Sequence, residues 1–268
     1  MSNLQKELEQ EARLYLQEVL SKDPEIEAVW DKLAIFLIGS GVTQYASEYS
    51  GLDLLILVPE SDHAAIQAAV DKIRHLPARL RWQYSRPRSP RRYQIVPLHV
   101  WRNSLELYQD DALYWMEHGL LLHDPTGDGS QLQDLARQRP ETLWQEKCLQ
   151  SYQEFRRRKA SLAWSLRRGH QLVILENLVQ ILYHTLALCF YFQREIPAPK
   201  KWIFRGALRT EFGSEVRGIF YELFRSFGDL ATLGGSDNLS LNKIYRMITR
   251  IQGEIESKLV ENGWKNRR

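Results

Sequence analysis

The chain has 268 residues, of which 44% are hydrophobic and 26% charged, and its formal net charge is +3. These values are ordinary for a protein with a large buried core, and the length allows two domains. So small a net charge excludes any argument for a general polyanion binder. The two cysteines, Cys148 and Cys189, exclude a disulfide framework and a cysteine-rich metal motif. The charged N-terminal stretch does not resemble a secretory signal, and we expect a cytoplasmic protein.

The first part of the chain alternates helical and strand patterns. Residues 4–20 place apolar side chains on one helical face, and Pro24 suits the first turn of a further short helix. The apolar runs 33–39 and 52–58 have strand length and predict neighbouring strands that are covered on both faces. Between them we expect a glycine–serine turn and a short helix.

The middle of the chain predicts one more helix and one more strand before a hinge. Residues 61–76 begin with a capping residue and have helical spacing. Residues 92–101 predict a third strand, in which Pro97 indicates a sheet edge or a bulge. Residues 110–132 indicate a helix, a short apolar segment and a turn-rich stretch, where we place the hinge between domains.

Beyond the hinge the pattern is helical almost throughout. The longest apolar stretch, 178–192, contains polar residues and is too short to span a bilayer, so we expect a buried helix and no membrane partner. The predicted helices cover 140–168, 170–193, 199–212, 213–228 and 240–263.

Gly39 and Ser40 follow the first predicted strand, and Asp53 begins the second. Glycine permits a tight turn whose backbone amides can hold a phosphate, and the serine hydroxyl adds a donor. Two carboxylates at alternate positions of a strand point to the same side and can bind Mg²⁺. Here only Asp53 is acidic, because position 51 is glycine.

The stretch "GSGVTQYASEYSGLDLLILV", residues 39–58, resembles the signature of the polymerase-beta-type nucleotidyltransferase superfamily. The kanamycin and lincosamide nucleotidyltransferases form the branch it resembles most. Weaker similarity continues over 114–127 and 167–202. The resemblance implies an α+β fold: a nucleotidyltransferase-type mixed sheet with flanking helices over 1–125, a linker over 126–139 and a helical bundle over 140–268. It also implies a ligand cleft between the two lobes.

The resemblance also assigns roles to particular residues. Gly39 and Ser40 would hold the phosphates of ATP or another nucleoside triphosphate, and Asp53 would be both a metal ligand and a catalytic residue. Glu176 is the nearest match to the family's base for the acceptor hydroxyl, and the bland alternative is a partly exposed helix glutamate. Lys201 would touch the triphosphate, unless it is only a surface lysine beside a core tryptophan.

Two of the three metal carboxylates that the resemblance implies are missing. The first falls on Gly51, and the third should lie on the strand within 92–101, which has no acid. Glu48 precedes the second strand, but a replacement role for it is unsupported. We therefore expect a weakened Mg²⁺ site and a degenerate protein, a pseudoenzyme in the strict case.

The segment 72–94 is rich in basic and aromatic residues. Arginines can grip phosphates and aromatic rings can stack on bases, so an RNA or an acidic partner could bind here. The alternative is a solvated basic hairpin. The basic residues of the segment are Lys72, Arg74, Arg79, Arg81, Arg86, Arg88, Arg91 and Arg92.

Three functions follow from these patterns. The first is a nucleotidyltransferase-type protein that binds a nucleotide or polyanion in the cleft, with lost or weak catalysis. The second is an active enzyme that moves a nucleoside monophosphate to a hydroxyl of a small molecule or a protein. In the third, the exposed arginines and aromatics form an oligomer surface. The sequence assigns no oligomeric state.

Overall fold

The two apolar runs in the first part of the chain form the central strands of a four-stranded sheet. β1 (Ala34–Ile38) pairs antiparallel with β2 (Asp53–Val58) and with β4 (Leu120–His123), and β2 pairs parallel with β3 (Arg92–Pro97). The order β3-β2-β1-β4 gives a mixed sheet with β3 at one edge. Every residue of β1 is buried, as expected for a strand covered on both faces.

The structure is a computed structural model that describes residues 2–74, 92–226 and 238–265. Its contacts divide the chain into two compact units, 1–138 and 139–268. The segment 126–139, expected to be a linker, contains helix α7 (Asp128–Arg137), and the division falls after this helix.

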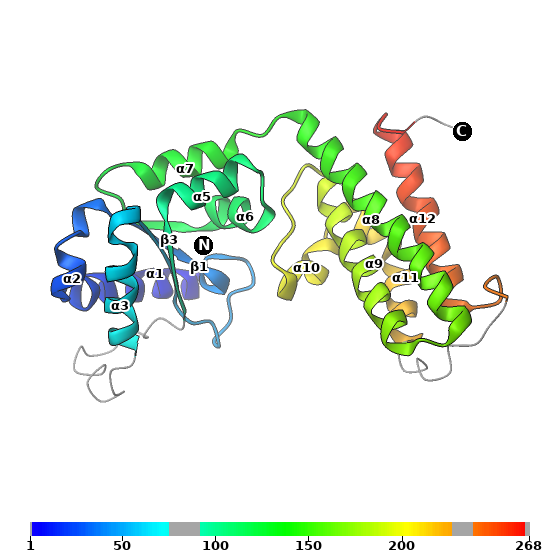
Figure 1. Cartoon of the computed structure of the whole chain (residues 1–268), viewed down its shortest axis with the longest axis horizontal. Helices are drawn as coiled ribbons and strands as arrows, with labels where there is room; N and C mark the ends of the chain where they lie inside the picture. Colours follow the sequence, from blue (N-terminus) through cyan, green and yellow to red (C-terminus); the bar gives the residue numbers. More distant parts are fainter. Residues whose placement is uncertain (1, 75–91, 227–237, 266–268) are drawn as a thin grey trace. The chain divides into compact units, whose positions relative to one another are not determined.

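Helices cover both faces of the sheet in the first unit. One face packs against α1 (Asn3–Glu18), α2 (Pro24–Glu27) and α3 (His63–Arg74) through a single apolar cluster. The other face meets α5 (Leu98–Glu106), α6 (Asp110–His118) and α7. Figure 1 shows α5, α6 and α7 on one side of the strands and α1 on the other.

Residues of one strand alternate between these two faces. Ile35, Leu37 and Leu54 belong to the cluster with α1 and α3. On the opposite face, a Cβ atom built on Gly129 of α7 would lie 3.1 Å from the ring of Phe36. By the same alternation, Asp53 lies on the face of Phe36, toward α5, α6 and α7.

Two local predictions differ from the structure, and one segment that the sequence left unassigned is a strand. The strand predicted over 92–101 ends at Pro97, and the residues after it form α5, because proline lacks the N–H of a sheet ladder but suits a helix start. The short apolar segment before the turn-rich stretch is a fourth strand, β4. The short helix expected before β2 is absent from the described residues, where a 3-10 turn over Gly39–Val42 is followed by further turns.

The second unit is helical, as predicted. Together with the mixed sheet and its flanking helices, this confirms the α+β class with a helical C-terminal region. Its helices are α8 (Glu141–Arg168), α9 (Gln171–Tyr191), α10 (Lys200–Ala207), α11 (Glu211–Ser226) and α12 (Lys243–Glu261).

α9 lies at the centre of this unit. Within the described part of the chain, it is the one helix long and apolar enough to cross a membrane, but 56% of its most apolar window is buried inside the protein. Its buried Asn177 donates to the hydroxyl of Ser161 on α8 and to the carbonyl of Val173. The helix therefore has the partners of a core helix in a bundle.

A polar network ties α12 to α8. The Tyr152 hydroxyl donates to the Glu256 carboxylate, Gln252 donates to the same oxygen at 2.9 Å, and Lys265 lies 3.2 Å from it. These donors, led by the hydrogen bond from Tyr152, lower the pKa of Glu256 from 4.5 to about 2. A carboxyl whose pKa is depressed by folding stabilises the folded state above its unfolded pKa.

This network predicts a stability change at acidic pH. The contribution of Glu256 should be complete above about pH 4.5 and should be lost as the pH falls toward 2. Glu256→Gln should therefore lower the urea midpoint at pH 7 but not at pH 2. Glu254→Gln, an exposed change on the same helix, is the control and should leave the midpoint unchanged at both pH values. Equal midpoints for wild type and Glu256→Gln at pH 7 would refute the role of the network.

Candidate functional site

The chain turns back at Gly39, directly after β1. Gly39 has φ +82°, a left-handed conformation that favours glycine, and Ile38 pairs in register with Asp53. A Cβ atom on Gly39 would lie only 2.2 Å from Oδ2 of Asp53. The carboxyl group of Asp53 therefore lies against the Cα atom of Gly39, so the turn and the acid share one place in the fold.

Ser40 follows in the same turn, half-buried. Its carbonyl accepts hydrogen bonds from the backbone N–H of Thr43 at 3.2 Å and from the Thr43 hydroxyl at 3.3 Å. Its own hydroxyl makes no hydrogen bond to the part of the chain that the structure describes.

The N-terminal helix holds the turn in place. Gln5 of α1 donates from Nε2 to the carbonyl of Thr43 at 3.1 Å. A Cβ atom on Gly41 would lie 3.2 Å from Cδ1 of Leu8, so the turn packs closely on the buried side of α1. Only a residue without a side chain fits this approach comfortably.

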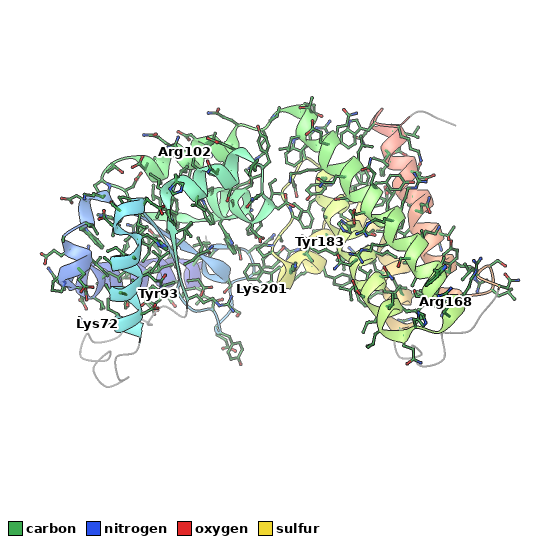
Figure 2. All side chains as sticks on the ribbon, viewed as in Figure 1. Lys72, Tyr93, Arg102, Arg168, Tyr183 and Lys201 are labelled. Carbon is green, nitrogen blue, oxygen red and sulfur yellow. The ribbon has the colours of Figure 1, made fainter. Side chains whose placement is uncertain are left out.

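Arg92 is the neighbour of Asp53 in the sheet. The two residues are register partners in the parallel pair of β2 and β3, and Gln94 partners Leu55. Tyr93, between them, points to the other face, where its hydroxyl shares a hydrogen bond with that of Tyr15 on α1 (Figure 2). Arg92 and Gln94 therefore lie on the face of Asp53.

Both of these β3 side chains are exposed. Neither Arg92 nor Gln94 forms an ion pair or a side-chain hydrogen bond with the described part of the chain. A cation thus stands in the sheet beside Asp53, on the strand where the resemblance implies a carboxylate. Sequence reasoning noted the missing acid but not this pairing.

The end of α6 closes the face next to the turn. A Cβ atom on Gly119, just after α6, would lie 3.4 Å from Cγ2 of Ile38, the register partner of Asp53. Tyr114 of α6 is buried, and burial, followed by the nearby Tyr45 and Glu117, raises the pKa of its phenol. Tyr114 is therefore neutral at physiological pH. In the sequence, the signal for this part of the site was the weaker family resemblance over 114–127.

The donors near the turn do not fit a Mg²⁺ site. Magnesium prefers near-octahedral oxygen ligation, commonly from one or two carboxylates plus substrate phosphates. Position 51 is a buried glycine, and Glu48 is exposed among the turns before β2. Within the ranges 2–74, 92–226 and 238–265, no three His, Cys, Asp or Glu side chains are grouped to hold a metal ion. Asp53 has a guanidinium, not a second carboxylate, as its neighbour in β3.

Glu176 and Lys201 belong to the second unit. Glu176 pairs with Arg158 of α8 at 3.3 Å, and 63% of its side chain is exposed. Lys201, at the start of α10, lies 4.0 Å from the ring centroid of Trp202 (Figure 2). The catalytic role expected for Glu176 and the triphosphate contact expected for Lys201 stay predictions.

Most of the basic segment 72–94 lies outside the described residues. Lys72, exposed on α3, and Arg92 on β3 lie within them, and they stand at the two ends of the segment. The predicted RNA or acidic partner of this segment stays a prediction.

Comparison with known proteins gives remote similarities. No protein-family profile matches the chain, and no curated protein matches it. A nucleotidyltransferase-like protein from Exiguobacterium sibiricum has a similar structure at 16% identity and a TM-score of 0.44, covering 95% of this chain and 75% of that one. A spectinomycin adenyltransferase from Enterococcus faecialis, with ATP and spectinomycin, is similar at 12% identity and a TM-score of 0.35, covering 91% and 98%. TM-scores below 0.5 do not establish a shared fold, so the site rests on its own geometry.

Proposed function

We propose that this protein is a nucleotidyltransferase-type protein that binds a nucleoside triphosphate at the turn over residues 39–42, with nucleotidyl transfer lost or severely weakened. The observation that carries the proposal is the contact between Gly39 and the carboxyl group of Asp53. The contact supports the proposal because it brings together the glycine–serine turn and the aspartate, the two parts of the sequence signature over residues 39–58.

Weak or absent catalysis follows from the charges around Asp53. Two Mg²⁺ ions that neutralise a triphosphate and activate a hydroxyl need several carboxylates. Here Gly51 and Arg92 occupy positions where such carboxylates would be useful. Asp53 alone, with water and substrate phosphates, could hold one ion only weakly.

The alternative is an active nucleotidyltransferase, which the retained Asp53 favours. It would move a nucleoside monophosphate from ATP or another triphosphate to a hydroxyl of a small molecule or a protein. Asp53 would hold the metal ion.

Calorimetry and a transfer assay separate these two functions. We expect ATP to bind to the wild-type protein and α-labelled ATP to give no transfer above background with Mg²⁺ or Mn²⁺. Transfer that disappears in Asp53→Ala would establish the active enzyme instead. An absence of binding for ATP, GTP, CTP and UTP would refute the proposal altogether.

A further inference from the structure

We propose that Arg92 takes the place of a divalent ion at this site, so that the triphosphate binds through its phosphates without Mg²⁺. This inference rests on the proposed function and specifies the ligand form: the free nucleotide, not its magnesium complex. It is carried by the register pairing of Asp53 with Arg92 and by the exposed, unpaired guanidinium within the described residues.

The charges at this end of the sheet favour an anion over a cation. Neighbouring strands are about 5 Å apart, so Arg92 adds a positive charge on the face of Asp53, although its guanidinium forms no ion pair with the described residues. That charge repels a divalent cation and offsets the negative charge of Asp53, which by itself would repel a phosphate. A buried glycine at position 51 adds no compensating acid.

The donors available on the same face suit phosphate oxygens. A guanidinium can donate two parallel hydrogen bonds to one phosphate, a geometry that lysine cannot supply. Gln94 is two residues further along β3 on the same face, and Ser40 follows Gly39, which the carboxyl group of Asp53 contacts. Neither group has a side-chain hydrogen bond within the described residues. These three donors come from two separate elements that meet at one end of the sheet.

This arrangement reverses the usual effect of magnesium. Mg²⁺ bound to ATP neutralises half of the phosphate charge and occupies oxygens that Arg92 would otherwise contact. Free ATP should therefore bind more tightly than magnesium–ATP. Inorganic tripolyphosphate should compete with ATP, whereas adenosine should not.

The test is titration calorimetry with ATP in EDTA and again in excess Mg²⁺. Wild type should bind in EDTA and more weakly in Mg²⁺. Arg92→Ala should weaken binding in EDTA by about tenfold or more, the usual effect of losing a charge-assisted hydrogen bond. Lys6→Ala is the matched control: it removes the same charge from exposed α1, on the opposite face of the sheet, and should leave the affinity unchanged.

A second variant should reverse the effect of Mg²⁺ on the affinity for ATP. Arg92→Asp places an acid beside Asp53 and should make ATP binding dependent on Mg²⁺. Circular dichroism should show that both Arg92 variants fold, because the side chain is exposed on an edge strand.

Other results of the titrations would contradict either this inference alone or the proposed function as well. Wild-type binding that occurs only with Mg²⁺, or equal affinity of wild type and Arg92→Ala in EDTA, would overturn the inference and leave the proposed function standing. An absence of binding with and without Mg²⁺ would overturn both.

Discussion

Gly39→Ala is expected to lower the free energy of unfolding by about 3 kcal/mol or more and to abolish triphosphate binding. The backbone at this position has φ +82°, which an alanine adopts only with strain. Its methyl group would also lie 2.2 Å from Oδ2 and 2.9 Å from Cγ of Asp53. Relief requires a movement of either the turn or β2, and both belong to the proposed site.

Gly127→Ala tests the backbone strain of a positive φ without the steric clash that a Cβ atom makes at Gly39. Gly127 has a similar φ of +78°, but a Cβ atom there would meet nothing within 4 Å. Gly127→Ala should lower the free energy of unfolding only through this backbone strain, by about 1–2 kcal/mol, and should leave triphosphate binding intact. Chemical denaturation and calorimetry measure both quantities for the two variants.

The double variant Gly39→Ala, Asp53→Ala identifies the contact itself. Truncation of Asp53 removes the atoms at 2.2 and 2.9 Å and leaves its Cβ atom at 3.0 Å. The double variant should therefore lose less stability than the sum of the two single variants. Strict additivity would mean that the carboxyl group of Asp53 does not lie against Gly39, and the proposed site would have to be abandoned.

Gly213→Ala is expected to destabilise the helical unit by about 1–3 kcal/mol, the range found when a packed site is overfilled. Gly213 lies in the first turn of α11, where its N–H donates to the hydroxyl of Thr210 at 3.0 Å. An added Cβ atom would lie 1.9 Å from the carbonyl oxygen of Ala207 and 2.7 Å from its carbon. Those are backbone atoms at the end of α10, so the chain between the two helices would have to shift.

Gly218→Ala, on the same helix, should change the free energy of unfolding in the opposite direction. Gly218 is exposed, and a Cβ atom there would meet nothing within 4 Å. Because glycine costs a helix interior roughly 0.5–1 kcal/mol relative to alanine, this change should raise the free energy of unfolding by about that amount. Thermal unfolding measures both variants. No loss of stability in Gly213→Ala would contradict the packing of α11 against the end of α10, and a loss in Gly218→Ala would contradict the open surroundings of Gly218.

The sequence predicted the parts of the site that lie close together along the chain. The apolar runs 33–39 and 52–58 have the length and composition of buried strands, and they form β1 and β2. A glycine followed by serine at the end of such a run indicates a turn, and Asp53 at the start of the next run is then brought back to it. Two consecutive strands often pair, which is why this contact could be expected from local patterns.

Short or ambiguous segments were harder to predict. β4 has four residues, too few for a period of two to be distinguished from a helical turn, and only its pairing with β1 makes it a strand. The residues after Pro97 read as a continuation of the strand because Leu98, Val100 and Trp101 are apolar and two of them, Val100 and Trp101, favour strands. They form α5 instead, because the second face of the sheet needs a covering helix.

The amino-acid sequence by itself determined the central strands, the Gly39 turn with Asp53, and the helical second half, because each depends on periodicity and composition within a short window. Only the tertiary structure decided that Arg92 stands beside Asp53 and that Glu176 pairs with Arg158. The strand register and the ion pair bring together residues far apart in the chain. A shift of one residue in β3 would turn Arg92 to the opposite face, and no local pattern fixes that register.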